Sequence, residues 1–107
     1  MVWATWCQPC VNELPYFAKL AQSLKDRPDV QVVSFNTDDN PETARQFMRR
    51  NGYDFPVILA KNFAEDLMPY FSIPRTWVIR DGAITMESVG FGNDGDQWID
   101  HIAGLVK

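Results

Sequence analysis

The chain has 107 residues, of which 46% are hydrophobic and 22% are charged, and this is enough apolar material for one hydrophobic core. Fourteen acidic residues against ten basic ones give a formal net charge of −4, which argues against nucleic acid or anionic lipid as a partner. No apolar run has the length of a membrane-spanning helix, and no charged segment followed by an apolar one marks a targeting signal. We therefore expect one domain over residues 1–107.

The first predicted elements are a strand, a helix and a second strand. Residues 2–4 are typical of the last residues of a strand. Apolar side chains then recur at helical spacing over residues 10–24, and polar residues end this amphipathic helix. Residues 30–36 (VQVVSFN) are rich in β-branched and aromatic side chains and predict a buried strand.

Local capping signals mark the next helix. Asn40 is a favourable N-cap, Pro41 suits the first helical position, and Gly52 suits a left-handed C-cap, so we predict a helix between them. Residues 55–59 (FPVIL) predict a short strand. Residues 62–71, which begin with a capping box formed by Asn62 and Glu65 and continue through Met68 and Phe71, predict a third helix.

A hairpin and a last helix complete the chain. Asp81-Gly82 is the strongest short-range signal for an antiparallel hairpin, with strands at 76–80 and 83–89. The last helix opens at 94–96 and buries Trp98, Ile99, Ile102 and Val106. Early alternation of strands and helices implies parallel pairing, and the hairpin adds an antiparallel edge, so the fold class is α/β with a mixed sheet.

The two cysteines, Cys7 and Cys10, are the centre of the chemistry. Cys7 falls at the start of the first helix, where unpaired amides and the helix dipole favour a thiolate. Cys10 lies one turn inside the helix, close enough to resolve a mixed disulfide formed at Cys7. Pro9 fits the first helical turn and stiffens the loop between the sulfurs.

Two simpler interpretations of the pair remain open. It could be half of a metal site, but a closed zinc site needs four ligands and only His101, far along the chain, is left over. It could also be a structural disulfide, but so short a loop adds only modest stabilisation. We expect no metal and no cofactor other than a redox-active Cys7–Cys10 disulfide.

With the stretch WATWCQPC on a strand-to-helix turn, and Ile73-Pro74-Arg75-Thr76 leading into a hairpin, the chain resembles the thioredoxin superfamily. In that family an Ile-Pro of this kind carries a cis peptide bond and packs beside the reactive sulfurs, a role that the resemblance assigns to Pro74. Ile73 would offer backbone groups to an extended substrate segment. We expect Trp6, Gln8 and Pro9 to line the same surface.

More narrowly, the segment from Cys7 to Pro15 is similar to the WCxPCxxExP pattern of the TlpA/ResA branch of thiol-disulfide oxidoreductases. On helical spacing alone Glu13 is a surface carboxylate. The resemblance instead implies that Glu13 exchanges protons with Cys10. Members of the branch usually begin with a further hairpin and a full strand before this motif, so we expect an exposed sheet edge and an unfilled core here.

The function implied is thiol-disulfide exchange on protein substrates, with the pair acting as a reductant. The branch implies a bacterial, periplasmic or otherwise extracytoplasmic setting, a role such as cytochrome c maturation, and an upstream, membrane-bound electron donor. The residues leave the compartment, the oligomeric state and two other functions open: a redox-inactive peptide-binding module and a CxxC metal carrier.

The remaining large side chains are assigned to the core or to the surface. The predicted core residues are Trp3, Trp77 and Trp98, and the residues predicted to fill gaps in the core are Met68 and Met86. His101 is a predicted surface residue.

Overall fold

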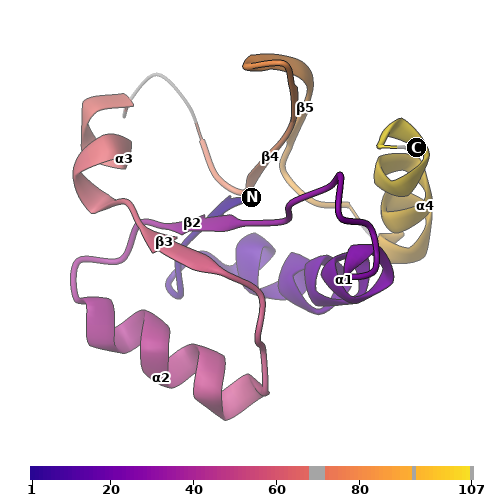
Figure 1. Cartoon of the computed structure of the whole chain (residues 1–107). Coiled ribbons are helices and arrows are strands. Elements are labelled where there is room, and N and C mark those ends of the chain that lie inside the picture. Colours follow the sequence, from indigo (N-terminus) through magenta and orange to yellow (C-terminus); the bar gives the residue numbers. More distant parts are fainter. Residues whose placement is uncertain (68–71, 93, 107) are drawn as a thin grey trace.

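A mixed sheet forms the centre of the computed structural model, which describes residues 1–67, 72–92 and 94–106 (Figure 1). The strand order is β3-β2-β1-β4-β5. Strands β1, β2 and β3 are parallel, whereas β4 pairs antiparallel with both β1 and β5, which confirms the predicted fold class. The strands are β1 (Val2–Trp3), β2 (Ser34–Asn36), β3 (Val57–Leu59), β4 (Arg75–Arg80) and β5 (Ala83–Val89).

The helices cover the two faces of this sheet unequally. They are α1 (Gln8–Leu24), α2 (Pro41–Asn51), α3 (Lys61–Leu67) and α4 (Gly95–Leu105). Side chains of α1, α2 and α4 pack with Trp3 or Val78 on one face. Phe35 pairs in register with Val2, so it points to the opposite face, where it stacks with Phe63 of α3 at a ring-centroid distance of 6.1 Å.

Local capping and turn signals predict both ends of α2, the start of α4 and the hairpin correctly. The Asn40 side chain accepts a hydrogen bond from the Glu42 amide at 3.0 Å, and Gly52 takes the left-handed conformation with φ 66°. Asp81 and Gly82 have φ values of 54° and 78°, the positive signs that a two-residue hairpin turn requires. Asp94 caps α4 by accepting from the Gln97 amide at 2.9 Å.

Two predicted boundaries are wrong. The strand expected over residues 30–36 is a strand only from Ser34, because β1 has two residues and offers no partner to the preceding four positions. The third helix begins at Lys61, so Asn62 lies inside its first turn and is not the cap. Lys61 Nζ lies 3.6 Å from the Glu65 carboxylate, a favourable contact between residues one turn apart. The predicted continuation through Met68 and Phe71 lies outside the described residues.

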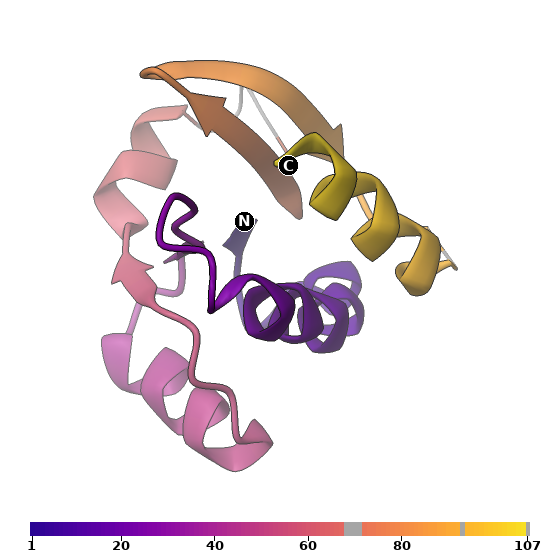
Figure 2. The ribbon, with the colours of Figure 1, turned by 45° about the vertical axis from the view of Figure 1, so that its right-hand side comes forward.

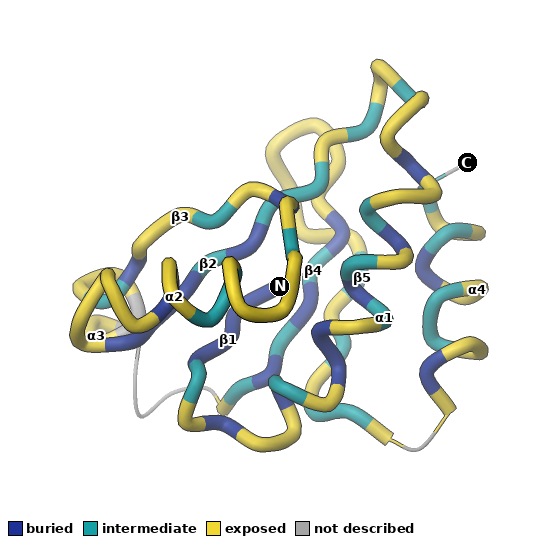
Figure 3. Tube along the Cα trace, turned by 90° about the horizontal axis from the view of Figure 1, so that it is seen from below, coloured by how far each residue is buried: buried dark blue, intermediate teal, exposed yellow. Residues whose placement is uncertain are grey.

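The core consists of two apolar clusters along α1. Figure 3 colours the buried positions of α1, β1, β2 and β4 dark blue. One surrounds the beginning of α1 and the end of β1, and the other lies between the end of α1, β4 and α4. Trp98 is half-buried and packs against both clusters, which confirms its core position. Figure 2 shows α4 lying beside α1. The buried residues are Met1, Trp3, Ala4, Cys7, Cys10, Leu14, Phe17 and Phe55 in the first cluster, and Leu20, Leu24, Val78 and Ile102 in the second.

The prediction that Trp77 is a core residue is wrong. Arg75 pairs with Val2, so Trp77, two positions further along β4, also points away from α1 and α4. Its side chain is half-buried on this face, and its indole N–H donates to Glu87 at 2.7 Å. Alternation along the strand therefore overrides the general tendency of tryptophan to be buried. Met86, in contrast, packs against the second cluster as predicted.

A cavity of about 540 Å³ interrupts the sheet between residues 30–33 and β4. The cavity is lined in part by Leu20 and Leu24 of α1 and by Ile102 of α4, so part of the second cluster faces it.

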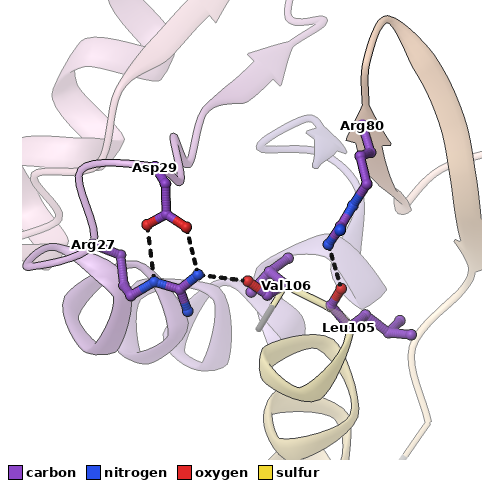
Figure 4. A network of polar contacts seen from close by, with 5 residues as sticks. All are labelled: Arg27, Asp29, Arg80, Leu105 and Val106. Atoms are coloured by element: carbon purple, nitrogen blue, oxygen red, sulfur yellow. Dashed lines mark hydrogen bonds and ion pairs between the residues drawn. The ribbon is translucent and has the colours of Figure 1, made fainter.

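Two arginines beside this cavity hold the end of α4 (Figure 4). Arg27 forms two hydrogen bonds with Asp29, at 3.0 and 2.7 Å, and donates to the Val106 carbonyl at 2.9 Å. Arg80 donates to the Leu105 carbonyl at 3.2 Å. Because the last carbonyls of a helix lack partners within the helix and carry partial negative charge, these contacts anchor α4 to α1 and β4.

Candidate functional site

A disulfide between Cys7 and Cys10 lies at the N-terminus of α1. Cys7 is the N-cap residue, and its Sγ accepts from the Cys10 amide at 3.3 Å. The unpaired amides and positive dipole end of α1 are therefore directed at the Cys7 sulfur, an environment that stabilises a thiolate when the pair is reduced. Cys7 is 6% exposed and Cys10 is fully buried, which is the order expected for an attacking and a resolving sulfur.

The Ile73–Pro74 segment lies against the disulfide. Its peptide bond is cis, the isomer expected from the resemblance. Cys7 Sγ is 3.8 Å from the Ile73 carbonyl oxygen, and Ile73 packs against the first apolar cluster. Pro74 is fully buried, and its carbonyl accepts from the Gly90 amide at 2.9 Å. Residues 66 positions apart in the chain therefore meet at the sulfur, as predicted.

Three predicted surface residues form an exposed rim around the disulfide. Trp6 is 67% exposed, and Gln8 and Pro9 are exposed in the first turn of α1. Gln8 donates to Asn12 at 2.9 Å, which holds its side chain along the helix. The aromatic side chain that precedes the nearly buried Cys7 is therefore largely open to solvent.

Glu13 is buried, so its interpretation as a surface carboxylate is wrong. It is 1% exposed, and its Oε2 has no hydrogen-bond partner within the described ranges. Burial raises the pKa of the Glu13 carboxyl from 4.5 to about 7, and the positive charge of the Met1 amino group opposes part of this rise. Because Glu13 lies one helical turn after Cys10, a carboxyl that titrates near neutral pH is a close neighbour of the buried sulfur.

Sequence reasoning missed a second buried carboxylate, Asp38. It is 7% exposed and follows β2, at the same edge of the sheet at which β1 leads into the cysteines. It accepts hydrogen bonds from Thr5 and Asn36. The signal that points to it is a polar run directly after a buried strand, at the carboxyl end of a parallel sheet, where functional residues gather.

His101 is exposed on α4, as predicted. Within residues 1–67, 72–92 and 94–106, no group of three or more His, Cys, Asp or Glu side chains is arranged to hold a metal ion. No helix in the described part of the chain is long and apolar enough to cross a membrane.

Comparison with known proteins gives a consistent result. The profile of the Redoxin family matches residues 1–97. The thiol-disulfide oxidoreductase ResA of Bacillus subtilis is 37% identical over 109 residues, which cover 98% of this chain and 58% of ResA. The chain therefore spans little more than half the length of this relative.

Solved structures show the same fold. StoA from Bacillus subtilis is 25% identical with a TM-score of 0.74, over 92% of this chain and 76% of StoA. A Chlorobium tepidum protein assigned as thiol:disulfide interchange protein DsbE is also 25% identical, with a TM-score of 0.82 over 99% of this chain and 77% of that protein. The chain belongs to the Redoxin family and is a ResA-like member of the thioredoxin superfamily.

Proposed function

We propose that residues 1–107 form one thioredoxin-like domain that catalyses thiol-disulfide exchange on protein substrates, with Cys7 and Cys10 as its catalytic residues. The observation that carries the proposal is the position of Cys7. Its sulfur caps α1, accepts an amide hydrogen bond and lies 3.8 Å from the Ile73 carbonyl. The names of ResA and DsbE describe the same chemistry in relatives.

The proposed reaction transfers two electrons in two exchange steps. The Cys7 thiolate attacks one sulfur of a substrate disulfide and releases the other substrate sulfur as a thiolate. The Cys10 thiolate then attacks Cys7 Sγ, which releases the second substrate sulfur and forms the Cys7–Cys10 disulfide. Glu13 accepts the proton of the Cys10 thiol before this attack, and its raised pKa suits that exchange near neutral pH.

The substrate segment is proposed to bind in an extended conformation beside Ile73, with main-chain hydrogen bonds, and to contact Trp6, Gln8 and Pro9. The direction proposed is reduction of the substrate, because Gln8 and Pro9 bring no charge that would destabilise the disulfide. An upstream, membrane-bound dithiol donor would then reduce the pair again. The setting proposed from the branch that the chain resembles is bacterial and extracytoplasmic, as in cytochrome c maturation.

A redox titration tests the proposal. Tryptophan fluorescence is followed in glutathione and dithiothreitol buffers, with Trp6→Phe as the control that removes the reporter beside the disulfide. We expect a reversible two-electron transition with a midpoint near the reducing end of the known range, roughly −270 mV. A midpoint near about −120 mV would make the protein an oxidant.

Trapping distinguishes the roles of the two sulfurs. Cys10→Ser should accumulate mixed disulfides with a substrate, because Cys7 attacks and nothing resolves the adduct, whereas Cys7→Ser should be inactive. Trapping by Cys7→Ser instead would reverse the assignment. A folded protein with two free thiols and no transition in the titration would favour a peptide-binding module, and stoichiometric uptake of Zn(II) or Cu(I) by the reduced protein would favour a metal carrier.

A further inference from the structure

The carboxylate of Asp38 is surrounded by hydrogen-bond donors. Oδ2 accepts from the Thr5 amide at 2.9 Å and from the Asn36 side-chain amide at 2.8 Å. Oδ1 accepts from the Thr5 hydroxyl at 2.7 Å. Asn36 in turn accepts from the Asp38 amide at 3.0 Å, and Asn36 is 1% exposed. The carboxylate is therefore fixed from two sides, by β2 and by the segment that follows β1.

Thr5 belongs to the turn that presents the attacking sulfur. This active-site turn, residues 4–7, is closed by a hydrogen bond from the Cys7 amide to the Ala4 carbonyl at 3.2 Å. Just before it, the Trp3 carbonyl accepts from the Thr37 amide at 3.0 Å. Residues 36–38 thus hold the chain at Trp3 and again at Thr5, two residues before Cys7.

Burying the Asp38 carboxylate costs free energy, which the hydrogen bonds around it must offset. A buried acid without partners is strongly destabilising, and among the described residues Asp38 has no cationic side chain at ion-pair distance. Its compensation comes from hydrogen bonds, and two of the three donors belong to Thr5. Hydrogen bonds are directional, so three of them on one carboxylate restrict the position of the turn more tightly than apolar contacts would.

We propose that Asp38 is a positioning residue for the exchange reaction: through Thr5 it holds the active-site turn so that Cys7 Sγ stays at the N-terminus of α1 and beside the Ile73 carbonyl. The inference rests on the proposed function of Cys7. Small displacements of a reacting group cost large factors in rate, since a shift of about 1 Å can lower a rate about 100-fold.

The hydrogen bonds, and not the charge, carry this role. In Asp38→Asn the side-chain oxygen still accepts from the Thr5 and Asn36 N–H groups. The new amide group then donates to the Thr5 hydroxyl, which rotates to accept. Asp38→Ala removes all three contacts. Thr5→Val removes only the hydroxyl contact in a side chain of similar shape, and Asp39→Ala is the matched control, because Asp39 is 89% exposed and contacts Lys61 at 3.5 Å.

The first measurement is the second-order rate at which each reduced, folded variant attacks the small aromatic disulfide 5,5′-dithiobis(2-nitrobenzoate). We expect Asp38→Ala to lower the rate about tenfold and Thr5→Val about threefold, with Asp38→Asn and Asp39→Ala within about twofold of the parent protein. Loss of stability alone does not lower the rate per folded molecule. Equal rates for Asp38→Ala and the parent would overturn the inference, and so would an Asp38→Asn rate as low as that of Asp38→Ala.

Amide hydrogen exchange of the oxidised protein gives a second measurement that needs no activity. In Asp38→Ala the Cys7 amide should exchange at least about tenfold faster, while the Leu14 amide inside α1 should change little. If Asp38→Ala does not fold, Thr5→Val takes its place with a smaller expected change. A parent protein without exchange activity but with the expected amide pattern refutes the proposed function alone. An active parent with unchanged amides refutes the positioning role alone.

Discussion

Replacing Glu13 by glutamine should make the folding stability of this protein less dependent on pH. The carboxyl has a raised pKa in the folded protein, about 7 against 4.5, so the folded state binds its proton more tightly than the unfolded state. Stability from this group is therefore fully present below about pH 4.5 and is lost as the pH rises through about 7. Glutamine has no such proton, so the variant avoids this loss.

The expected size follows from the shift and the burial. Glu13 is 1% exposed, so solvent screens the effect little. A rise of about 2.5 pKa units corresponds to about 3 kcal/mol at 1.36 kcal/mol per unit. Relative to the parent protein, Glu13→Gln should therefore gain about 3 kcal/mol between about pH 4.5 and about pH 8.5. Any fixed cost of burying the new amide is the same at every pH and drops out of this difference.

Urea unfolding of the oxidised protein at several pH values measures the difference directly. The Met1 amino group, whose pKa burial lowers to about 6, is present in both proteins, but the charge of Glu13 raises this pKa, so the contribution of Met1 differs between the two curves. Glu42→Gln serves as a control because it removes an acidic side chain from an exposed position of α2. A difference between Glu13→Gln and the parent that stays constant over the whole pH range would show that the reasoning from burial is wrong.

Two further predictions concern reactivity and packing. The pH profile of Cys7 reactivity should contain an inflection near pH 7 that is absent in Glu13→Gln, and an unchanged profile would separate Glu13 from the thiol chemistry. Gly95→Ala should destabilise the protein by about 1–3 kcal/mol, because the new Cβ would overlap the Tyr16 ring and push α4 away from α1. Gly104→Ala, in open space on the same helix, should be neutral or stabilise by up to about 1 kcal/mol, and similar thermal unfolding midpoints for the two alanine variants would contradict this contrast.

The features that the sequence predicts correctly depend on neighbours in the chain. Asn40 and Gly52 bound α2 because capping involves residues within one turn. Asp81-Gly82 forms the hairpin because the turn needs positive φ values at both positions. Cys7 and Cys10 form the disulfide at the start of α1 because three residues in a helical turn bring the sulfurs together.

The errors arise where a distant element decides the outcome. Residues 30–33 have strand-forming side chains but no partner strand on the side of β1. Their β-propensity alone therefore does not produce the hydrogen bonds between strands that define a β-strand. The side of the sheet that Trp77 occupies depends on the register between β1 and β4, which no local pattern specifies. Helix α3 begins one residue early, within the uncertainty of any capping motif.

The two buried carboxylates show why residue type alone does not predict a role. Both are acidic residues, a type that is rarely fully buried, and both belong by residue type on the surface. Asp38 has three donors at 2.7 to 2.9 Å, so its oxygens are fixed and it acts through the position of its neighbours. Glu13 keeps one oxygen without a hydrogen-bond partner in the described structure, and burial raises its pKa to about 7, so its proton is held until near-neutral pH. The hydrogen-bond donors around each carboxyl group thus distinguish the two: three of them hold Asp38, whereas burial raises the pKa of Glu13.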